Sequence, residues 1–139
     1  MVERKYDFPT IPPDTVENWI HQGATVNILD TREKVEYETS HLPQSIHVGY
    51  DELKWGVIDT LDRDKPVVVY CSIGVRSQNI AKKMKENGFE DVKNLYGGAF
   101  LWAEQFRPLK DSLGQETKNI HGYNRFWGRW IDKAPVVYE

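Results

Sequence analysis

The sequence predicts an α/β fold: a small, mainly parallel sheet with helices on both of its faces. Two observations lead to this class. Short apolar runs alternate along the chain with segments whose apolar residues recur at helical spacing. The strongest run, residues 67–70 (VVVY), is apolar throughout, which is typical of a strand buried on both faces of a parallel sheet.

The composition indicates one compact module. The chain has 139 residues, and 40% of them are hydrophobic, which is enough for a single core. We expect a domain over residues 1–108 and an aromatic-rich extension over residues 109–139 packed on the same domain. The net charge of −3 argues against a nucleic-acid partner. No secretory leader and no apolar run of about 18 residues is found, so we expect a cytoplasmic protein without a membrane partner.

The first third of the chain predicts a helix, a strand and a turn of helix, in that order. Residues 10–23 have prolines where a helix can begin, apolar residues at helical spacing, and a glycine where it can end. Residues 25–30 (TVNILD) predict a short buried strand. Val35 and Tyr37 then indicate one helical turn, because Pro43 prevents a longer helix.

The middle of the chain continues this alternation. Residues 46–48 (IHV) predict a short strand, and residues 51–62 place four apolar side chains on one helical face. After the strand at 67–70, the apolar residues Ile80, Ala81 and Met84 share one side of a helix. A glycine follows at the position where this helix is expected to end.

The last part of the chain closes the domain and then changes character. Residues 92–98 (VKNLYGG) predict a strand and a glycine turn, and residues 99–106 predict a short helix. The extension begins polar but becomes rich in aromatic residues, which is unlike a disordered tail. We expect it to fold back onto the domain, and a surface for a partner is the alternative. Its clustered aromatic residues are Tyr123, Phe126, Trp127 and Trp130.

Cys71, the only cysteine, directly follows the apolar strand. In open α/β sheets, ligands bind beyond the carboxyl ends of the strands. Residues 71–76 (CSIGVR) include a glycine that lets the backbone curl, so that successive amides can point at the sulfur. These amides and the start of the following helix favour a thiolate, which is the nucleophilic form. The alternative is that Cys71 is only a small buried apolar residue.

The segment around Cys71 resembles the active-site loop of the single-domain rhodaneses, whose signature is Cys, two variable residues, Gly, one variable residue, Arg and Ser. Upstream, LDTREKVEYETSHLPQSIHV is similar to the family's pattern of Asp-x-Arg, Glu-Tyr and Gly-His-Ile-Pro-Gly-Ala, although Ser40, Gln44 and Ser45 depart from it. Downstream, VKNLYGGAFLWAEQ resembles the family's closing strand, double glycine and tryptophan-bearing helix. The residues that match are Asp30, Arg32, Glu36, Tyr37, His41, Pro43, Cys71, Gly74, Arg76 and Ser77.

The resemblance implies a sulfurtransferase. Cys71 would take a sulfane sulfur from a donor such as thiosulfate, hold it as a persulfide, and pass it to a thiophilic acceptor such as cyanide or a thiol. The implied partners are a small sulfur donor and an acceptor, and the acceptor can be a protein. No cofactor and no metal are implied. The residues implied to bind the substrate are Ser72, Ile73, Gly74, Val75, Arg76 and Ser77.

Two other functions stay open. A persulfide-carrying or sensing module with little turnover of its own would have the same cysteine. The rhodanese fold is also shared with phosphatases, which adds a phosphatase-like or arsenate-reductase-like enzyme. Four residues separate Cys71 from Arg76, whereas the phosphatase signature has five, so the loop length favours sulfur over phosphate.

Arg76 has two interpretations. It attracts an anionic donor, or it turns away and pairs with Asp30 or Glu36, and we favour the second because one arginine then holds loop to scaffold. Arg32 and Glu36 are expected to form an ion pair within a short helical turn. We therefore expect Asp30, Arg32 and Glu36 to lie near the site in a structural role.

Ser77 and His41 are the remaining matched polar residues near the site. Ser77 is expected to cap the start of the helix and to be able to donate towards the sulfur. His41 precedes a proline-containing turn, and we expect it to hydrogen-bond the scaffold near the site rather than to act in catalysis. The other histidines, which show no metal-ligand spacing, are His21, His47 and His121.

Overall fold

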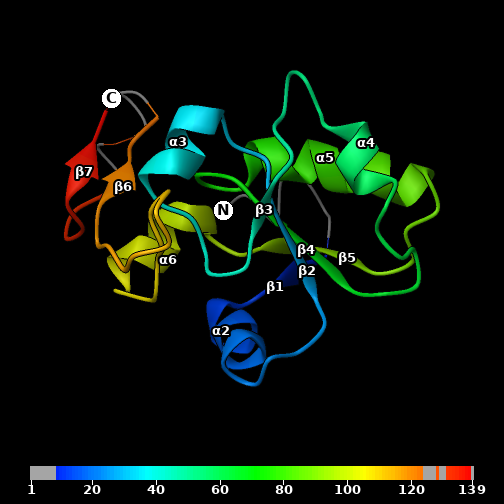
Figure 1. Cartoon of the computed structure of the whole chain (residues 1–139), viewed down its shortest axis with the longest axis horizontal. Helices are drawn as coiled ribbons and strands as arrows, with labels where there is room; N and C mark the ends of the chain where they lie inside the picture. The colour runs from blue at the N-terminus through cyan, green and yellow to red at the C-terminus, as the bar shows by residue number, and fades with distance from the viewer. Residues whose placement is uncertain (1–8, 124–127, 129–130, 139) are drawn as a thin grey trace.

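Figure 1 shows the computed structural model of the chain, which describes residues 9–123, 128 and 131–138. Five strands form one sheet in the order β1-β5-β4-β2-β3, and each neighbouring pair is parallel. The predicted α/β class with a mainly parallel sheet is therefore confirmed. The strands are β1 (Thr10–Ile11), β2 (Asn27–Asp30), β3 (Ile46–His47), β4 (Val67–Tyr70) and β5 (Val92–Leu95).

The helices follow the predicted order, with one difference in length. Residues 51–62 were expected to be helical over one amphipathic face, but α4 covers only Trp55–Ile58. Lys54 before it is not helical (φ −80°, ψ 74°), and after it the bonds from Thr60 to Val57 and from Leu61 to Ile58 close tighter turns. The other helices are α2 (Pro13–His21), α3 (Lys34–Thr39), α5 (Val75–Glu86) and α6 (Gly98–Glu104).

Helices cover both faces of the sheet because side chains alternate along each strand. All four residues of β4 are buried, two on each face, as the continuous apolar run predicts. One face packs against α2 and α6, and the residues of the five-stranded sheet on it are Ile11, Ile28, Val68, Tyr70 and Leu95. The opposite face packs against α4 and α5, and its strand residues are Leu29, Val67, Val69 and Val92.

The described part of the extension lies against this domain. It contains two short paired strands, β6 (Ile120–His121) and β7 (Val136–Val137), and β6 lies beside α3 and α6 (Figure 1). Ile120 is fully buried and belongs to the core that α6 covers. The predicted packing of Phe126, Trp127 and Trp130 concerns residues outside the described part. The domain boundary at residue 108 stays a prediction.

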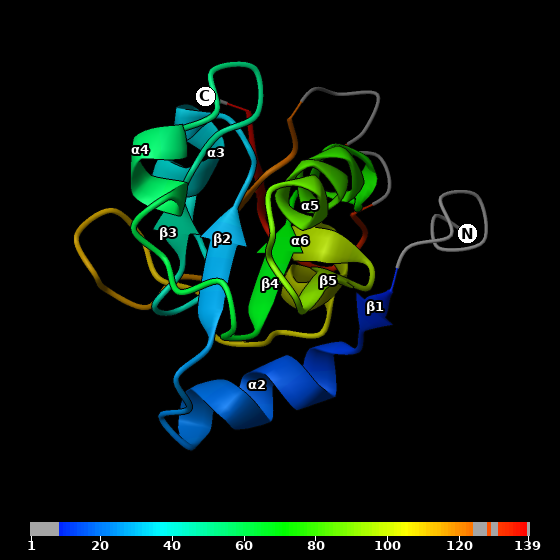
Figure 2. The same cartoon turned by 90° about the vertical axis from the view of Figure 1, so that its right-hand side faces the viewer.

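The carboxyl ends of the central strands define one edge of the sheet. Asp30 at the end of β2 is in register with Tyr70 at the end of β4, so the loops that follow both strands begin side by side. Figure 2 shows these two strands pointing upward, with α2 below their starting ends. The loop with the cysteine follows β4 and therefore lies at the upper edge of the sheet.

Among the described helices, none is long and apolar enough to cross a bilayer.

Candidate active site

Cys71 begins the loop between β4 and α5, and its side chain is buried at 1% exposure. Gly74, the residue before α5, has a φ of 111°, a conformation that glycine adopts without steric cost. The Gly74 N–H donates to Cys71 Sγ at 3.1 Å. A backbone donor and the amino-terminal end of α5 are thus directed at the sulfur, and both can stabilise negative charge on it.

The start of α6 fastens the other side of the loop. The amides of Ala99 and Phe100 donate to the carbonyl oxygens of Cys71 and Ser72, at 2.8 Å and 3.0 Å. Because N–H and C=O point in opposite directions across a trans peptide, the amides that follow these carbonyls face away from α6. Gly98, with a φ of 61°, permits this approach, since a Cβ there would lie 2.6 Å and 2.5 Å from the two carbonyl oxygens.

Asn94 is a site residue that the sequence reasoning missed. It lies buried in β5, where its Oδ1 accepts from Ser77 Oγ at 2.6 Å and its Nδ2 donates to the Gly74 carbonyl at 3.0 Å. Its only signal in the sequence is an uncharged polar side chain in a short strand that also contains Lys93, and that signal does not reveal a partner. Asn94 therefore connects Gly74 and the first turn of α5 to the neighbouring strand β5.

The expected role of Ser77 as a helix cap is wrong. Gly74 is the N-cap of α5, and Ser77 is the third residue of the helix itself. Ser77 Oγ lies 3.4 Å from Cys71 Sγ, but its single hydroxyl hydrogen has a much shorter bond, 2.6 Å, to Asn94. Ser77 thus contacts the sulfur while holding the loop in place through Asn94.

Arg76 has the second of its two arrangements. Its guanidinium donates to both carboxylate oxygens of Glu36, at 2.9 Å and 3.1 Å, and to Ser72 Oγ at 2.9 Å. Burial raises the pKa of Glu36, but the hydrogen bonds and charge of Arg76 outweigh it, so this pKa lies below its ordinary value of 4.5. The pair joins the cysteine loop to α3 as a charge-compensated bridge.

The expected ion pair between Arg32 and Glu36 is wrong. Arg32 lies before α3, whose N-cap is Glu33, so the spacing of a helical pair does not apply to it. Its Nη2 instead lies 2.6 Å from Asp30 Oδ2, and both side chains are fully buried. The Tyr70 hydroxyl donates to the same carboxylate at 2.7 Å. This buried cluster connects the ends of β2 and β4 behind the cysteine loop.

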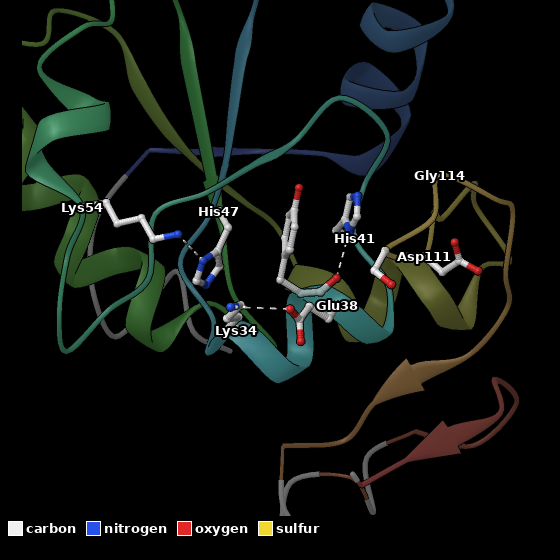
Figure 3. Close-up of a pocket in the computed structure, with 9 residues that line it drawn as sticks. Lys34, Glu38, His41, His47, Lys54, Asp111 and Gly114 are labelled. Carbon is white, nitrogen blue, oxygen red and sulfur yellow. Dashed lines mark hydrogen bonds and ion pairs between the residues drawn. The ribbon is translucent and has the colours of Figure 1, made fainter.

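His41 lies in a different hollow from Cys71. Its Nδ1 donates to the Tyr37 carbonyl at 2.9 Å, and its ring stacks on the Tyr37 ring with centroids 3.9 Å apart. Figure 3 shows it beside a hollow of about 400 Å³ that His47, Lys54 and the loop at Asp111 also line. The Cys71 pocket is smaller, about 140 Å³, but it contains the nucleophile, and we therefore take it as the candidate site.

The Cys71 pocket includes one residue from the extension that the sequence did not assign to the site. Tyr123 lines it, and the Arg76 guanidinium carbon lies 4.5 Å from the centroid of the Tyr123 ring. Within the described part of the chain, no three histidine, cysteine or acidic side chains gather as a metal-binding group. The residues that line the pocket are Cys71, Ser72, Ile73, Val75, Arg76 and Tyr123.

Comparison with known proteins places this loop within a described family. The family model for the rhodanese-like domain matches residues 12–105. The thiosulfate sulfurtransferase GlpE of Pseudomonas syringae is 35% identical over 96 residues, which make up 69% of this chain and 88% of that protein. The matched range includes the cysteine loop, both helices that hold it, and Asn94.

Two further relatives are larger proteins. The probable adenylyltransferase/sulfurtransferase MoeZ of Mycobacterium tuberculosis is 31% identical over 100 residues, which cover 71% of this chain but only 26% of that protein. The crystal structure of a thiosulfate sulfurtransferase from Pseudomonas aeruginosa superposes with a TM-score of 0.70 and 28% identity, over 82% of this chain and 22% of that one. This chain thus spans about a quarter of each of these two proteins.

Proposed function

Because the chain belongs to the rhodanese-like domain family, we propose that it is a sulfurtransferase that moves sulfane sulfur through a persulfide on Cys71. The observation that carries this proposal is the position of the Cys71 sulfur. It lies at the end of β4, accepts from the Gly74 amide at 3.1 Å, and opens into a pocket of about 140 Å³.

The first half-reaction loads the enzyme. The Cys71 thiolate attacks the outer sulfur of a donor such as thiosulfate, the sulfur–sulfur bond of the donor breaks, and sulfite leaves with the bonding electron pair. The new persulfide extends from Cys71 into the pocket. The amides of the loop, from Ser72 to Arg76, are the groups proposed to stabilise charge on the sulfur as it is transferred.

The second half-reaction unloads it. An acceptor, cyanide or a thiolate, attacks the outer sulfur, and the Cys71 thiolate leaves. The loop must keep one geometry through both steps, because a displaced sulfur loses its amide donors. We propose that Arg76, Ser77 and Asn94 act as positioning residues that hold this geometry. Arg76 of α5 binds Glu36 of α3, and Ser77 of α5 binds Asn94 of β5.

The test is the mass of the protein after incubation with thiosulfate. We expect a gain of one sulfur atom that is lost on addition of cyanide, and no gain in Cys71→Ser. No added mass in the unchanged protein, or an equal gain in Cys71→Ser, would refute the persulfide mechanism.

A further inference from the structure

The hollow of about 400 Å³ beside His41 lies along one face of α3 and is separate from the Cys71 pocket. Lys34, Tyr37 and Glu38 line it and recur at helical spacing, and the His41 ring stacks on the Tyr37 ring. Glu36, which binds the cysteine loop, lies on the opposite face of the helix. This α3 hollow is therefore not used in the proposed sulfur transfer.

Hydrogen bonds to carbonyl oxygens fix both imidazole rings in the hollow. His47 Nε2 donates to the Arg32 carbonyl at 2.7 Å, and His41 Nδ1 donates to the Tyr37 carbonyl at 2.9 Å. Because a carbonyl oxygen only accepts, each of these nitrogens carries a hydrogen. His47 Nδ1 is then an acceptor for Lys54 Nζ, at 3.1 Å. His41 Nε2 has no partner among the described residues and is free for a ligand.

The cations of the hollow lie at the start of α3. Lys34 is the first residue of the helix, and its nearest carboxylate oxygen, on Glu38, is 3.9 Å away. Lys54 lies at the same end, because His47 connects it to the carbonyl of Arg32, which precedes the helix. The partner of Lys54 within the described residues is an uncharged ring nitrogen, so its charge is left for a ligand.

A carboxylate lies at the other end of the hollow. The backbone groups of Lys110 and His41 exchange two hydrogen bonds of 2.9 Å, which places Asp111 beyond the end of α3. Asp111 Oδ1 accepts from the amides of Leu113 and Gln115, and this turn holds the side chain while Oδ2 has no partner in the described part of the chain. Figure 3 shows Lys54 and Asp111 on opposite sides of His41.

This separation of charge determines which ligand the hollow fits. Its described lining has two lysines and two carboxylates, so a ligand with charge of one sign gains attraction at one end and meets repulsion at the other. A zwitterion with its charges far apart is attracted at both ends. A six-residue helix such as α3 is about 9 Å long, and an extended peptide of three residues spans about 10 Å. The volume of about 400 Å³ is in the range of pockets that bind small molecules.

We infer that the α3 hollow is a binding site for short peptides of two or three residues with free ends. The carboxylate of the peptide lies at Lys34 and Lys54, and its ammonium group lies at Asp111, where His41 Nε2 and Glu38 are further acceptors. This inference is independent of the chemistry at Cys71.

The experiment titrates the isotope-labelled protein with triglycine and follows its backbone amides by NMR. Two probes of the same length each lack one charge: N-acetyltriglycine has no ammonium group, and triglycinamide has no carboxylate. We expect triglycine to shift the amides of the hollow and to bind about fivefold more tightly than either probe, and added salt to weaken its binding.

Two substitutions test the assignment of the two ends. Lys54→Gln removes the cation and keeps a donor for His47, and Asp111→Asn removes the charge and keeps Oδ1 as an acceptor for the turn. We expect Lys54→Gln to weaken triglycine about fivefold without affecting triglycinamide, and Asp111→Asn to weaken triglycine about fivefold without affecting N-acetyltriglycine. Lys82→Gln and Glu86→Gln, at exposed positions of α5, are the matched controls and should change none of the three affinities.

Three results would overturn the inference. They are the absence of amide shifts in the hollow at millimolar triglycine, equal affinities for the three probes, and equal losses in the hollow variants and the α5 controls. If Lys54→Gln weakened triglycinamide as much as triglycine, the assigned orientation of the peptide would be wrong. None of these results affects the gain of sulfur on Cys71, so the two proposals fail separately.

Discussion

At the scale of single residues, Glu36 connects the scaffold to the cysteine loop. Its side chain is 1% exposed and binds Arg76 through both oxygens, while one of those oxygens also accepts from the Glu33 amide at 2.9 Å. Ser72 Oγ lies 3.0 Å from the same carboxylate. A buried carboxylate of this kind is tolerated because the charge of Arg76 and the hydrogen bonds from Glu33 and Ser72 replace its lost hydration. Loss of the Glu36 charge should therefore lower the stability of the protein and disturb the geometry of the cysteine loop.

We predict that Glu36→Gln lowers the free energy of unfolding at pH 7 by about 3 kcal/mol, because Arg76 is left without its compensating charge. Glu38→Gln on the same helix is the control, since Glu38 is half-exposed and its contact with Lys34 is 3.9 Å long. Urea unfolding of both variants measures the difference. Equal effects of the two substitutions would contradict a special role for Glu36.

The same pair also sets a dependence on pH. The pKa of Glu36 is lowered in the folded protein, so its stabilisation is fully present above its ordinary value of 4.5 and is lost as the pH falls through the lower, folded value. We therefore expect the difference between the unchanged protein and Glu36→Gln to shrink on acidification below pH 4.5.

At the scale of elements, the site depends on the contact between two helix starts. The loop before α5 curls around the sulfur, and the first amides of α6 bind the carbonyl oxygens of Cys71 and Ser72. The close approach needs a glycine at position 98, because a Cβ there would meet both carbonyl oxygens. The geometry of the cysteine loop is thus set jointly by β4, α5 and α6.

We predict that Gly98→Ala destabilises the protein by about 2 to 4 kcal/mol, because backbone strain and a steric clash add together, and that it slows persulfide formation. Gly23→Ala is the matched control. Gly23 has a similar φ of 68° but nothing within 4 Å of the added Cβ, so only strain of about 1 kcal/mol is expected. Unfolding and sulfur uptake are measured for both variants. A Gly98→Ala protein that loads sulfur at the normal rate would show that α6 does not shape the loop.

At the scale of the whole molecule, the extension and the sheet share a core. Ile120, Ile131 and Ala134 lie in the same buried cluster as Tyr70 and the side chains of α6. The extension therefore contributes to the core as well as to the Cys71 pocket. A shared core predicts that both parts unfold together.

We predict that Ile120→Ala lowers the free energy of unfolding by about 2 to 5 kcal/mol in a single transition, as expected for a fully buried residue. Leu113→Ala is the control from the same extension, because Leu113 is 80% exposed and should change stability by less than about 0.5 kcal/mol. Denaturant unfolding followed by two spectroscopic probes checks this. Two separate transitions would show that the extension folds independently.

Local features of this chain could be predicted from its sequence because they depend on neighbouring residues. The apolar run before Cys71 predicts a buried strand, and the strand, glycine and helix pattern around it predicts a curled loop with successive amides directed at the sulfur. The Gly74 amide is one that donates to it. The helical spacing predicts the amphipathic faces, although it overestimates α4, because tight turns can present the same apolar face.

The tertiary structure alone decided which distant residues complete the site. Arg76 pairs with Glu36 and does not face an anionic sulfur donor, and Arg32 pairs with Asp30 rather than with Glu36. Asn94 reaches the cysteine loop from β5, and Tyr123 reaches it from the extension. The physical reason is that charge pairing and pocket lining depend on three-dimensional distance. Spacing along the chain predicts such distances only within one helix or strand.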